Sequence, residues 1–164
     1  MSILLTGGTG FVGSHLLKVL EDKGDEVSLI SRKKISGYRV FLCDFLKDDI
    51  PADALKSIDT VYHLAGCAHD VNNINSDEVY KKINTQATID LANMAIKNGV
   101  KKFIFISSVK ASKSSDIYGK SKYEAEQKLI KISKESDMHI SIIRSSLVYG
   151  PNVKGNLKSM LDGI

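Results

Sequence analysis

Short apolar runs alternate with amphipathic segments along the whole chain, and this alternation constrains the fold more than any other feature. The strand-like runs are ILLT, EVSLIS, YRVFLC, TVYHLA, KFIFIS and HISIIRS. Between them, a helical period of apolar residues predicts helices at 11–23, 51–58, 76–98 and 118–133. Apolar strands that alternate with amphipathic helices are typical of a parallel sheet covered on both faces. We therefore predict an α/β fold with a doubly wound parallel sheet.

Two of the predicted helices have patterns that indicate which side faces the sheet. In the first helix the predicted buried stripe is Val12, Leu16, Val19 and Leu20. In the helix at 76–98 the stripe runs through Val79, Ile83, Ala87, Leu91 and either Met94 or Ala95. Glycine follows both helices, at Gly24 and Gly99, as is usual at helix C-termini.

A glycine-rich segment, TGGTGFVG, lies directly between the first strand and the first helix. Gly8, Gly10 and Gly13 fit a G-x-G-x-x-G pattern, and Gly7, Gly10 and Gly13 fit a G-x-x-G-x-x-G pattern. Such a loop allows the backbone to approach a pyrophosphate closely, and free N–H groups at the helix N-terminus attract the anion. The sequence therefore predicts a dinucleotide-binding site at this loop.

The residues after the second strand bear on the choice between NAD and NADP. An acidic residue at this point binds the ribose of NAD, whereas a cation accommodates the 2′-phosphate of NADP. This chain has Ser31, Arg32, Lys33 and Lys34 there. The cations favour NADP or mixed use, but they are explained equally well as a solvated turn, so the prediction is NAD or NADP.

Composition argues against several other functions. A hydrophobic content of 43% with 26% charged residues is typical of a globular protein, and no apolar run reaches the length of a membrane span. The net charge of +4 comes from scattered lysines without a basic stripe, so we predict no nucleic-acid partner. The two cysteines, Cys43 and Cys67, suit a cytoplasmic protein better than a disulfide framework.

Four residues near the end of the fourth predicted strand resemble a metal-binding cluster: His63, Cys67, His69 and Asp70. They straddle the end of this strand, and His63 is expected within the strand itself. We therefore predict no metal site, and we interpret Cys67 as a small buried residue.

Seven motifs follow one another in order: TGGTGFVG, FLCDF, VYHLAG, INTQAT, FIFISS, YGKSKYEAE and IIRSSLVYGP. With this ordered set the chain resembles the NAD-dependent epimerase/dehydratase branch of the extended short-chain dehydrogenase/reductase family, which includes UDP-glucose and UDP-N-acetylglucosamine 4-epimerases. The resemblance implies a Rossmann-type domain at 1–150 and, at 151–164, the start of a substrate-binding lobe that is otherwise missing. It also implies a nucleotide-sugar substrate and a homodimer that pairs through the helices at 76–98 and 118–133.

The same resemblance assigns residues to the cofactor. The implied pyrophosphate contacts are Gly7, Gly10, Phe11, Val12 and Gly13. The implied contacts of the adenine and the ribose are Asp44, Phe45, Ala65 and Gly66, and the position after the second strand adds Ser31 and Arg32 as cofactor contacts. Asn84 would steady the region of the fourth strand, and the remaining implied cofactor contacts are Ser107, Tyr118, Lys122 and Ser145.

The catalytic group implied by the resemblance is Ser108, Tyr118 and Lys122. Tyr118 and Lys122 lie four residues apart in the predicted helix at 118–133, so they share a face. An ammonium at that distance favours a phenolate, and we expect it to lower the pKa of Tyr118. Tyr118 would then exchange a proton with a sugar hydroxyl while hydride is removed from, and returned to, the sugar carbon.

The chain departs from the family pattern in two ways. The segment at 109–117 is shorter than in 4-epimerases of this branch, and the chain ends at Ile164, near the expected start of the substrate-binding lobe. The leading prediction is an NAD(P)-dependent nucleotide-sugar epimerase, similar to UDP-sugar 4-epimerases, of which this chain is a cofactor-binding fragment with little activity alone. The alternatives are an NAD(P)-dependent reductase of the same family and a non-catalytic dinucleotide-binding module.

Overall fold

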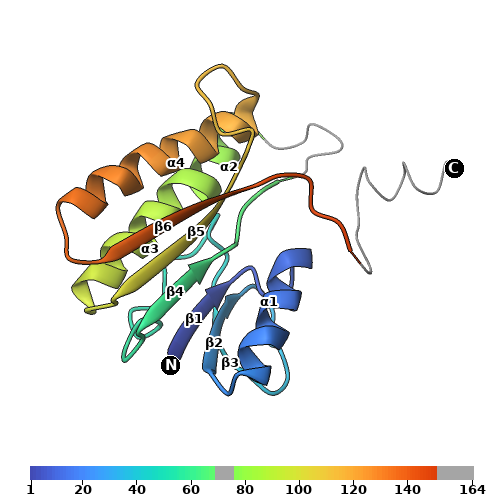
Figure 1. The fold of residues 1–164 in the computed structure, drawn as a ribbon, viewed down its shortest axis with the longest axis vertical. Coiled ribbons are helices and arrows are strands. Elements are labelled where there is room, and N and C mark those ends of the chain that lie inside the picture. The colour runs from blue at the N-terminus through green and yellow to red at the C-terminus, as the bar shows by residue number, and fades with distance from the viewer. Residues whose placement is uncertain (69–75, 151–164) are drawn as a thin grey trace, which may run out of the picture.

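The computed structural model describes residues 1–68 and 76–150. They form a fully parallel six-stranded sheet in the order β3-β2-β1-β4-β5-β6 (Figure 1). The strands are β1 (Ser2–Thr6), β2 (Glu26–Ser31), β3 (Arg39–Leu42), β4 (Thr60–His63), β5 (Lys102–Ser108) and β6 (His139–Ser145). The helices are α1 (Phe11–Asp22), α2 (Asp77–Tyr80), the π-helix η1 (Lys81–Gln86), α3 (Ala87–Lys97) and α4 (Ile117–Lys134). The strand order reverses at β1, which confirms the predicted doubly wound sheet.

Helices lie on both faces of this sheet (Figure 1). On one face α1 covers β1 and β2, where Leu17 packs against Leu5 and Leu29. On the other face α3 and α4 cover the sheet with a larger core, to which Leu91 and Leu129 contribute. None of the helices in the described part of the chain combines the length and apolar character that a membrane span needs.

The buried stripe of the first helix matches the predicted one only in part. Gly13, Leu17 and Leu20 are buried, whereas Val19 is 48% exposed. Gly13 is pressed against the glycine loop, because an added Cβ would lie 2.1 Å from the Gly7 carbonyl oxygen. This contact fixes the rotation of α1 and brings Leu17, rather than Val19, to the face that Gly13 occupies.

The prediction of a helix at 51–58 was wrong. The backbone N–H groups of Ala54, Lys56 and Ile58 bond carbonyls three residues earlier, which makes a series of turns. Ser57 has a φ of 62°, a conformation that an α-helix does not contain. Leu55 is fully buried, so this connection packs onto the core without helical structure.

The predicted helix at 76–98 is present, but the π-helix η1 interrupts its middle. A π-helical turn is wider than an α-helical one, so the buried face shifts along the helix. Tyr80, Asn84 and Thr85 are buried, whereas the predicted Val79 and Ile83 are only partly buried. The later part of the predicted stripe, in α3, is buried as predicted.

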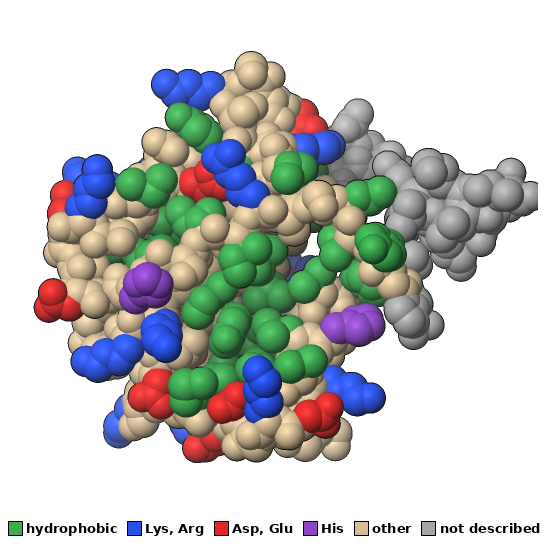
Figure 2. Space-filling view, viewed as in Figure 1, with side chains coloured by type: hydrophobic (Ala, Val, Ile, Leu, Met, Phe, Trp, Pro, Cys, Tyr) green, Lys and Arg blue, Asp and Glu red, His purple; other side chains and the backbone are tan. Residues whose placement is uncertain are grey.

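One face of β4, β5 and β6 lacks a covering helix among the described residues. Ile104 and Ile106 alternate along β5 with the buried phenylalanines of the larger core, so they point to the opposite side. Ile104 lies in register with Tyr62 of β4, and Ile106 lies in register with Ile143 of β6, which is 50% exposed. Apolar side chains gather near the centre of this side of the molecule (Figure 2). We call Tyr62, Ile104, Ile106 and Ile143 the open sheet face.

Candidate cofactor and catalytic site

The loop between β1 and α1 runs against the end of β4. Gly7 has a φ of 75°, and a Cβ there would lie 2.6 Å from the Ala65 backbone nitrogen, so this position requires glycine. Gly10 donates its backbone N–H to the Gly7 carbonyl at 2.9 Å and is the N-cap of α1, where no side chain accepts from the helix. The first amides of α1, starting at Phe11 and Val12, are therefore available for an anion.

The carboxyl ends of β2 and β3 lie beside this loop in the sheet. Ser31 ends β2, and its hydroxyl accepts a hydrogen bond from the Lys33 backbone N–H at 3.2 Å. Arg32, the next residue, is exposed, so its guanidinium is accessible to a phosphate group. After β3, Asp44 accepts from the Leu46 backbone N–H at 3.1 Å, so this carboxylate also stabilises its own turn.

His63 lies at the centre of a buried network below the loop. Its Nδ1 lies 2.7 Å from the Thr6 hydroxyl, and its Nε2 lies 2.9 Å from the Thr88 hydroxyl. Burial, with a smaller contribution from the charge of Lys122, lowers the pKa of His63 to about 3, so the imidazole is neutral. The Phe45 ring lies edge-on to it, with ring centroids 5.9 Å apart, and packs against the larger core.

This network gives both ring nitrogens of His63 a protein partner. The imidazole is therefore a structural group rather than a ligand directed at a metal. Two other members of the cluster considered from the sequence, His69 and Asp70, lie outside the described residues.

Asn84, from the π-helix, holds the segment that follows β4. Its Oδ1 accepts from the Cys67 backbone N–H at 2.8 Å, and its Nδ2 donates to the Cys67 carbonyl at 2.9 Å. Nδ2 also lies 2.9 Å from the Ser121 hydroxyl of α4. Gly66 fits between these groups, because a Cβ there would lie 3.0 Å from Asn84 Oδ1 and 3.2 Å from Lys122 Nζ.

The structure brings Ser108, Tyr118 and Lys122 to the carboxyl end of β5. Ser108 ends the strand and is 8% exposed, and its side chain forms a hydrogen bond with the half-buried Tyr118 phenol. Lys122 is 4% exposed, and its Nζ donates to the Ile106 carbonyl at 2.9 Å. The same ammonium lies 4.6 Å from the centroid of the Phe105 ring, over its face.

Burial moves the pKa values of Tyr118 and Lys122 toward their uncharged forms. It raises the pKa of Tyr118, although the hydrogen bond from Ser108 and the charge of Lys110 act in the lowering direction. It lowers the pKa of Lys122 to about 8, against the raising effect of Glu126. The expectation that Lys122 lowers the Tyr118 pKa was therefore wrong for this structure, because desolvation of the phenol is the dominant effect.

Two further serines lie near the ends of β5 and β6. Ser145 donates its hydroxyl to the Ser107 carbonyl at 3.0 Å, and its own carbonyl accepts from the Val109 backbone N–H at 3.0 Å. The Ser107 hydroxyl is buried and has no hydrogen-bond partner among the described residues. An unpaired polar atom of this kind, at the ligand-binding end of the sheet, fits a site that a cofactor completes.

Two interactions that position α4 were absent from the sequence analysis. Asp116 caps the helix, because its carboxylate accepts from the Gly119 backbone N–H at 2.8 Å. Glu126 is buried and forms an ion pair with Arg144 of β6. The four-residue spacing of Lys122 and Glu126 was a signal for this second group, but its Arg144 partner depends on the packing of α4 against β6.

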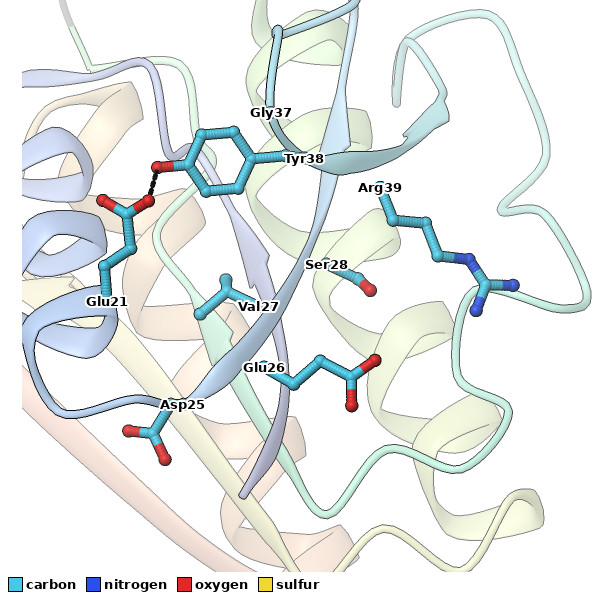
Figure 3. A pocket seen from close by; sticks show the side chains of 8 residues that line it. All are labelled: Glu21, Asp25, Glu26, Val27, Ser28, Gly37, Tyr38 and Arg39. Carbon is cyan, nitrogen blue, oxygen red and sulfur yellow. Dashed lines mark hydrogen bonds between the residues drawn. The ribbon is translucent and has the colours of Figure 1, made fainter.

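A cavity of about 320 Å³ lies at the opposite end of the sheet (Figure 3). Its lining residues come from the end of α1 and the starts of β2 and β3: Glu21, Asp25, Glu26, Val27, Ser28, Gly37, Tyr38 and Arg39. The Tyr38 hydroxyl donates to the Glu21 carboxylate at its edge. Because ligands of parallel α/β sheets bind outside the carboxyl ends of the strands, this cavity is separate from the candidate site.

Comparisons with known proteins identify relatives of this chain. The chain is 39% identical to UDP-glucose 4-epimerase from Vibrio cholerae, over 98% of this chain and 56% of that protein. It is 28% identical to N-acetyl-alpha-D-glucosaminyl-diphospho-ditrans,octacis-undecaprenol 4-epimerase from Escherichia coli O157:H7, over 99% of this chain and 54% of that protein. The chain thus spans about half the length of these curated relatives.

A solved structure of a related enzyme has a similar fold. UDP-glucuronic acid 4-epimerase from Bacillus cereus, in complex with UDP-glucuronic acid and NAD, superposes with a TM-score of 0.81 at 26% identity, covering 99% of this chain and 63% of that one. The sequence profile described as "NAD dependent epimerase/dehydratase family" matches residues 3–163. Because this match covers nearly the whole sequence, the chain belongs to the NAD-dependent epimerase/dehydratase family.

Proposed function

We propose that the chain binds NAD or NADP at the carboxyl end of its sheet and is the cofactor-binding part of a nucleotide-sugar epimerase, similar to UDP-sugar 4-epimerases. One observation carries the proposal: the glycine loop, the end of β4 and the Lys122 ammonium are in continuous contact. Gly7 abuts Ala65, and the next residue, Gly66, abuts Lys122. This line of contacts joins the available amides of α1 to the Ser108, Tyr118 and Lys122 group.

The residues along this line suit a dinucleotide. The amides at the start of α1 would hold the pyrophosphate, close to the backbone of Gly7, Gly10 and Gly13. Asp44 would accept from the adenine amino group, and Arg32 would attract a 2′-phosphate. The remaining predicted contacts are Phe11, Val12, Ser31, Phe45, Ala65, Gly66, Asn84, Ser107, Tyr118, Lys122 and Ser145.

A bound nicotinamide cofactor supplies the hydride acceptor and donor, and the protein's own residues would move the proton. Burial raises the pKa of Tyr118, so its phenol is protonated near neutral pH and can donate a proton to a sugar oxygen. Tyr118 can accept a proton only as a phenolate. The Ser108 hydroxyl and the Lys122 ammonium would stabilise this charged form. Ser108 would also bind the same sugar oxygen.

Cofactor titration of the purified chain tests the binding half of the proposal. We expect saturable binding of NAD or NADP, measured by calorimetry, and at least about tenfold weaker binding by Gly13→Ala, because the new Cβ displaces the Gly7 carbonyl. Gly99→Ala is the control for the loss of a constrained glycine, since Gly99 has a positive φ of 73° that alanine tolerates poorly but precedes the amino end of β5, away from the glycine loop. Absence of binding by the folded chain would contradict the proposal, and a tenfold or larger preference for NAD would contradict the role of Arg32.

The catalytic half needs a protein that carries this domain together with a substrate-binding region. There, Tyr118→Phe should lower turnover of a UDP-sugar by about 10²–10⁴-fold, because the proton donor and acceptor is lost. Tyr123→Phe, on the same helix, should retain turnover. Activity of the Tyr118→Phe variant within about tenfold of the unmodified protein would remove Tyr118 from this role.

Two alternatives remain tied to specific observations. A relative named UDP-2-acetamido-2,6-beta-L-arabino-hexul-4-ose reductase, from Pseudomonas aeruginosa, is 29% identical over 97% of this chain, which supports a reductase. The short segment at 109–117, between Ser108 and Tyr118, leaves a non-catalytic dinucleotide-binding module as the second alternative. Net oxidation of NAD(P)H by a keto-sugar identifies the reductase, and cofactor binding without turnover in the longer protein identifies the module.

We also propose the homodimer through the helices at 76–98 and 118–133, which sedimentation measurements would detect.

A further inference from the structure

Glu126 is a buried carboxylate that the proposed chemistry leaves without a role. It is 2% exposed and lies one helical turn after Lys122, on the same side of α4. A charged group at such a position is stabilised only when its oxygens have partners. Arg144 of β6 provides them, since its Nε donates to Oε1 at 2.9 Å and its Nη2 donates to Oε2. This two-pronged contact fixes the carboxylate in one orientation and ties α4 to β6.

The Lys122 ammonium, by contrast, has neutral contacts. Its hydrogen bond goes to the Ile106 carbonyl, and the Phe105 ring lies beneath it. His63, from β4, faces it as a neutral imidazole. Burial favours the uncharged amine, and Glu126 is the group that opposes this effect. On α4, Tyr118 lies one helical turn before Lys122, and Glu126 lies one turn after it.

Arg144 completes the set of charges around Lys122. Its side chain is 48% exposed, so the guanidinium is partly solvated while the carboxylate that it binds is not. Glu126 therefore has one charged partner in direct contact, Arg144, while its charge also favours the ammonium form of Lys122. Tyr123, like Glu126, favours the charged guanidinium of Arg144 and raises its pKa.

We propose that Glu126 is a positioning residue, whose buried carboxylate keeps Lys122 charged at the candidate active site, and that Arg144 fixes this carboxylate in place. The use of that charge, to stabilise a Tyr118 phenolate, rests on the proposed function. The electrostatic coupling between Glu126 and Lys122 is a property of the folded chain and does not require a cofactor or a substrate.

The coupling can be measured on the chain as it stands. The lysine side chains are labelled with carbon-13 at Cε, the Lys122 signal is assigned by its loss in Lys122→Arg, and the signals are followed by NMR from about pH 6 to about pH 11. Glu126→Gln should lower the Lys122 pKa by about one unit, because the opposing negative charge is gone. Arg144→Gln should raise it, because the Gln amide can still donate a hydrogen bond to the Glu126 carboxylate, whereas the positive charge that offsets this carboxylate is gone.

A second pair on α4 provides the control. Lys131 and Glu135 have the same four-residue spacing, with Nζ and Oε1 3.9 Å apart, but both side chains are largely exposed. Glu135→Gln should leave the pKa of Lys122 unchanged. A purely structural role of Glu126 in holding α4 against β6 predicts no opposite shifts in the Glu126 and Arg144 variants.

Shifts of the Lys122 pKa in opposite directions in the two variants support the inference. An unchanged Lys122 pKa in folded Glu126→Gln overturns it, and so do shifts in the same direction in both variants. If Glu126→Gln does not fold, Arg144→Gln decides: a raised Lys122 pKa supports the inference and an unchanged one overturns it. The outcome is separable from the proposed function. Failure of the unmodified chain to bind NAD or NADP removes that function while the measured coupling stands, and binding with no coupling removes this inference alone.

Discussion

At the scale of single residues, burial determines the chemistry of the site more than sequence spacing does. Lys122 and Tyr118 are four residues apart on α4, yet the phenol pKa is raised and the amine pKa is lowered to about 8, because both groups are desolvated. His63 follows the same rule, with its pKa lowered to about 3. Within the described residues, these three groups form the titratable centre of the candidate site.

The buried His63 predicts a specific acid sensitivity. Its folded-state pKa of about 3 lies below the ordinary value of 6.5, so between these values the unfolded chain binds more protons than the folded chain. The free energy of unfolding should therefore be highest above about pH 6.5 and fall as the pH is lowered, by up to about 1.4 kcal/mol per pH unit from this group. His63→Gln should flatten this dependence in urea denaturation measured at several pH values.

His15→Gln is the matched control for this experiment, since His15 lies on the surface of α1, where its Nδ1 is 2.8 Å from the Phe11 carbonyl oxygen. It should retain the pH dependence of the unmodified chain. An equal slope in His63→Gln and in the unmodified chain would show that a different group is responsible.

At the scale of elements, the π-helix η1 connects the segment after β4 to helix α4. Its wide turn directs Asn84 toward the segment after β4, and Thr85 donates its hydroxyl to the Ser121 carbonyl of α4 at 2.9 Å. In a regular α-helix, the side chains of Asn84 and Thr85 would point in other directions. The interruption therefore positions side chains at the site and is consistent with the tendency of π-helical turns to occur at functional sites.

Removal of the Asn84 amide tests this link. Asn84→Ala leaves the backbone groups of Cys67 without their buried partner, so the free energy of unfolding should fall by about 2 kcal/mol. Asn98→Ala is the comparison, because Asn98 is exposed and donates only to the Met94 carbonyl at the end of α3. In urea denaturation, Asn98→Ala should lower the free energy of unfolding by clearly less than Asn84→Ala does. Equal decreases for the two variants would argue against a linking role for Asn84.

At the scale of the whole molecule, the two faces of the sheet are covered to different extents. The larger core lies under α3 and α4, whereas α1 covers the other face only over β1 and β2. Parallel sheets are usually covered on both faces. Among the described residues, the open sheet face is the part of the sheet without a covering helix, and apolar side chains gather there (Figure 2).

The open sheet face should bind an apolar dye. Anilinonaphthalenesulfonate fluorescence should rise in the presence of the native chain, because the exposed Ile143 and the partly exposed side chains beside it form an apolar patch, and such patches bind apolar probes. Ile143→Thr should reduce that rise with little effect on stability, since this side chain is half-exposed. Ile130→Thr, an equally apolar position that is 42% exposed on α4, should not reduce it. The same reduction in both variants would place the dye elsewhere.

The sequence by itself determined the features that depend on short stretches of chain. The period of apolar residues specified all six strands, and the glycine pattern located the loop that Gly7 and Gly13 close. These signals are local, because a strand, a helix or a tight turn imposes its own spacing on neighbouring residues. The same local signals supported the resemblance to the family that the comparisons show.

Only the tertiary structure decided the features that depend on contacts between distant segments. The rotation of α1 follows from the contact of Gly13 with Gly7, and the connection at 51–58 packs as turns because its apolar residues meet the core without a helix. The ion pair of Glu126 with Arg144, and the pKa of Lys122, depend on how α4 lies against β5 and β6. Burial and charge are set by three-dimensional neighbours, and sequence spacing alone does not specify those neighbours.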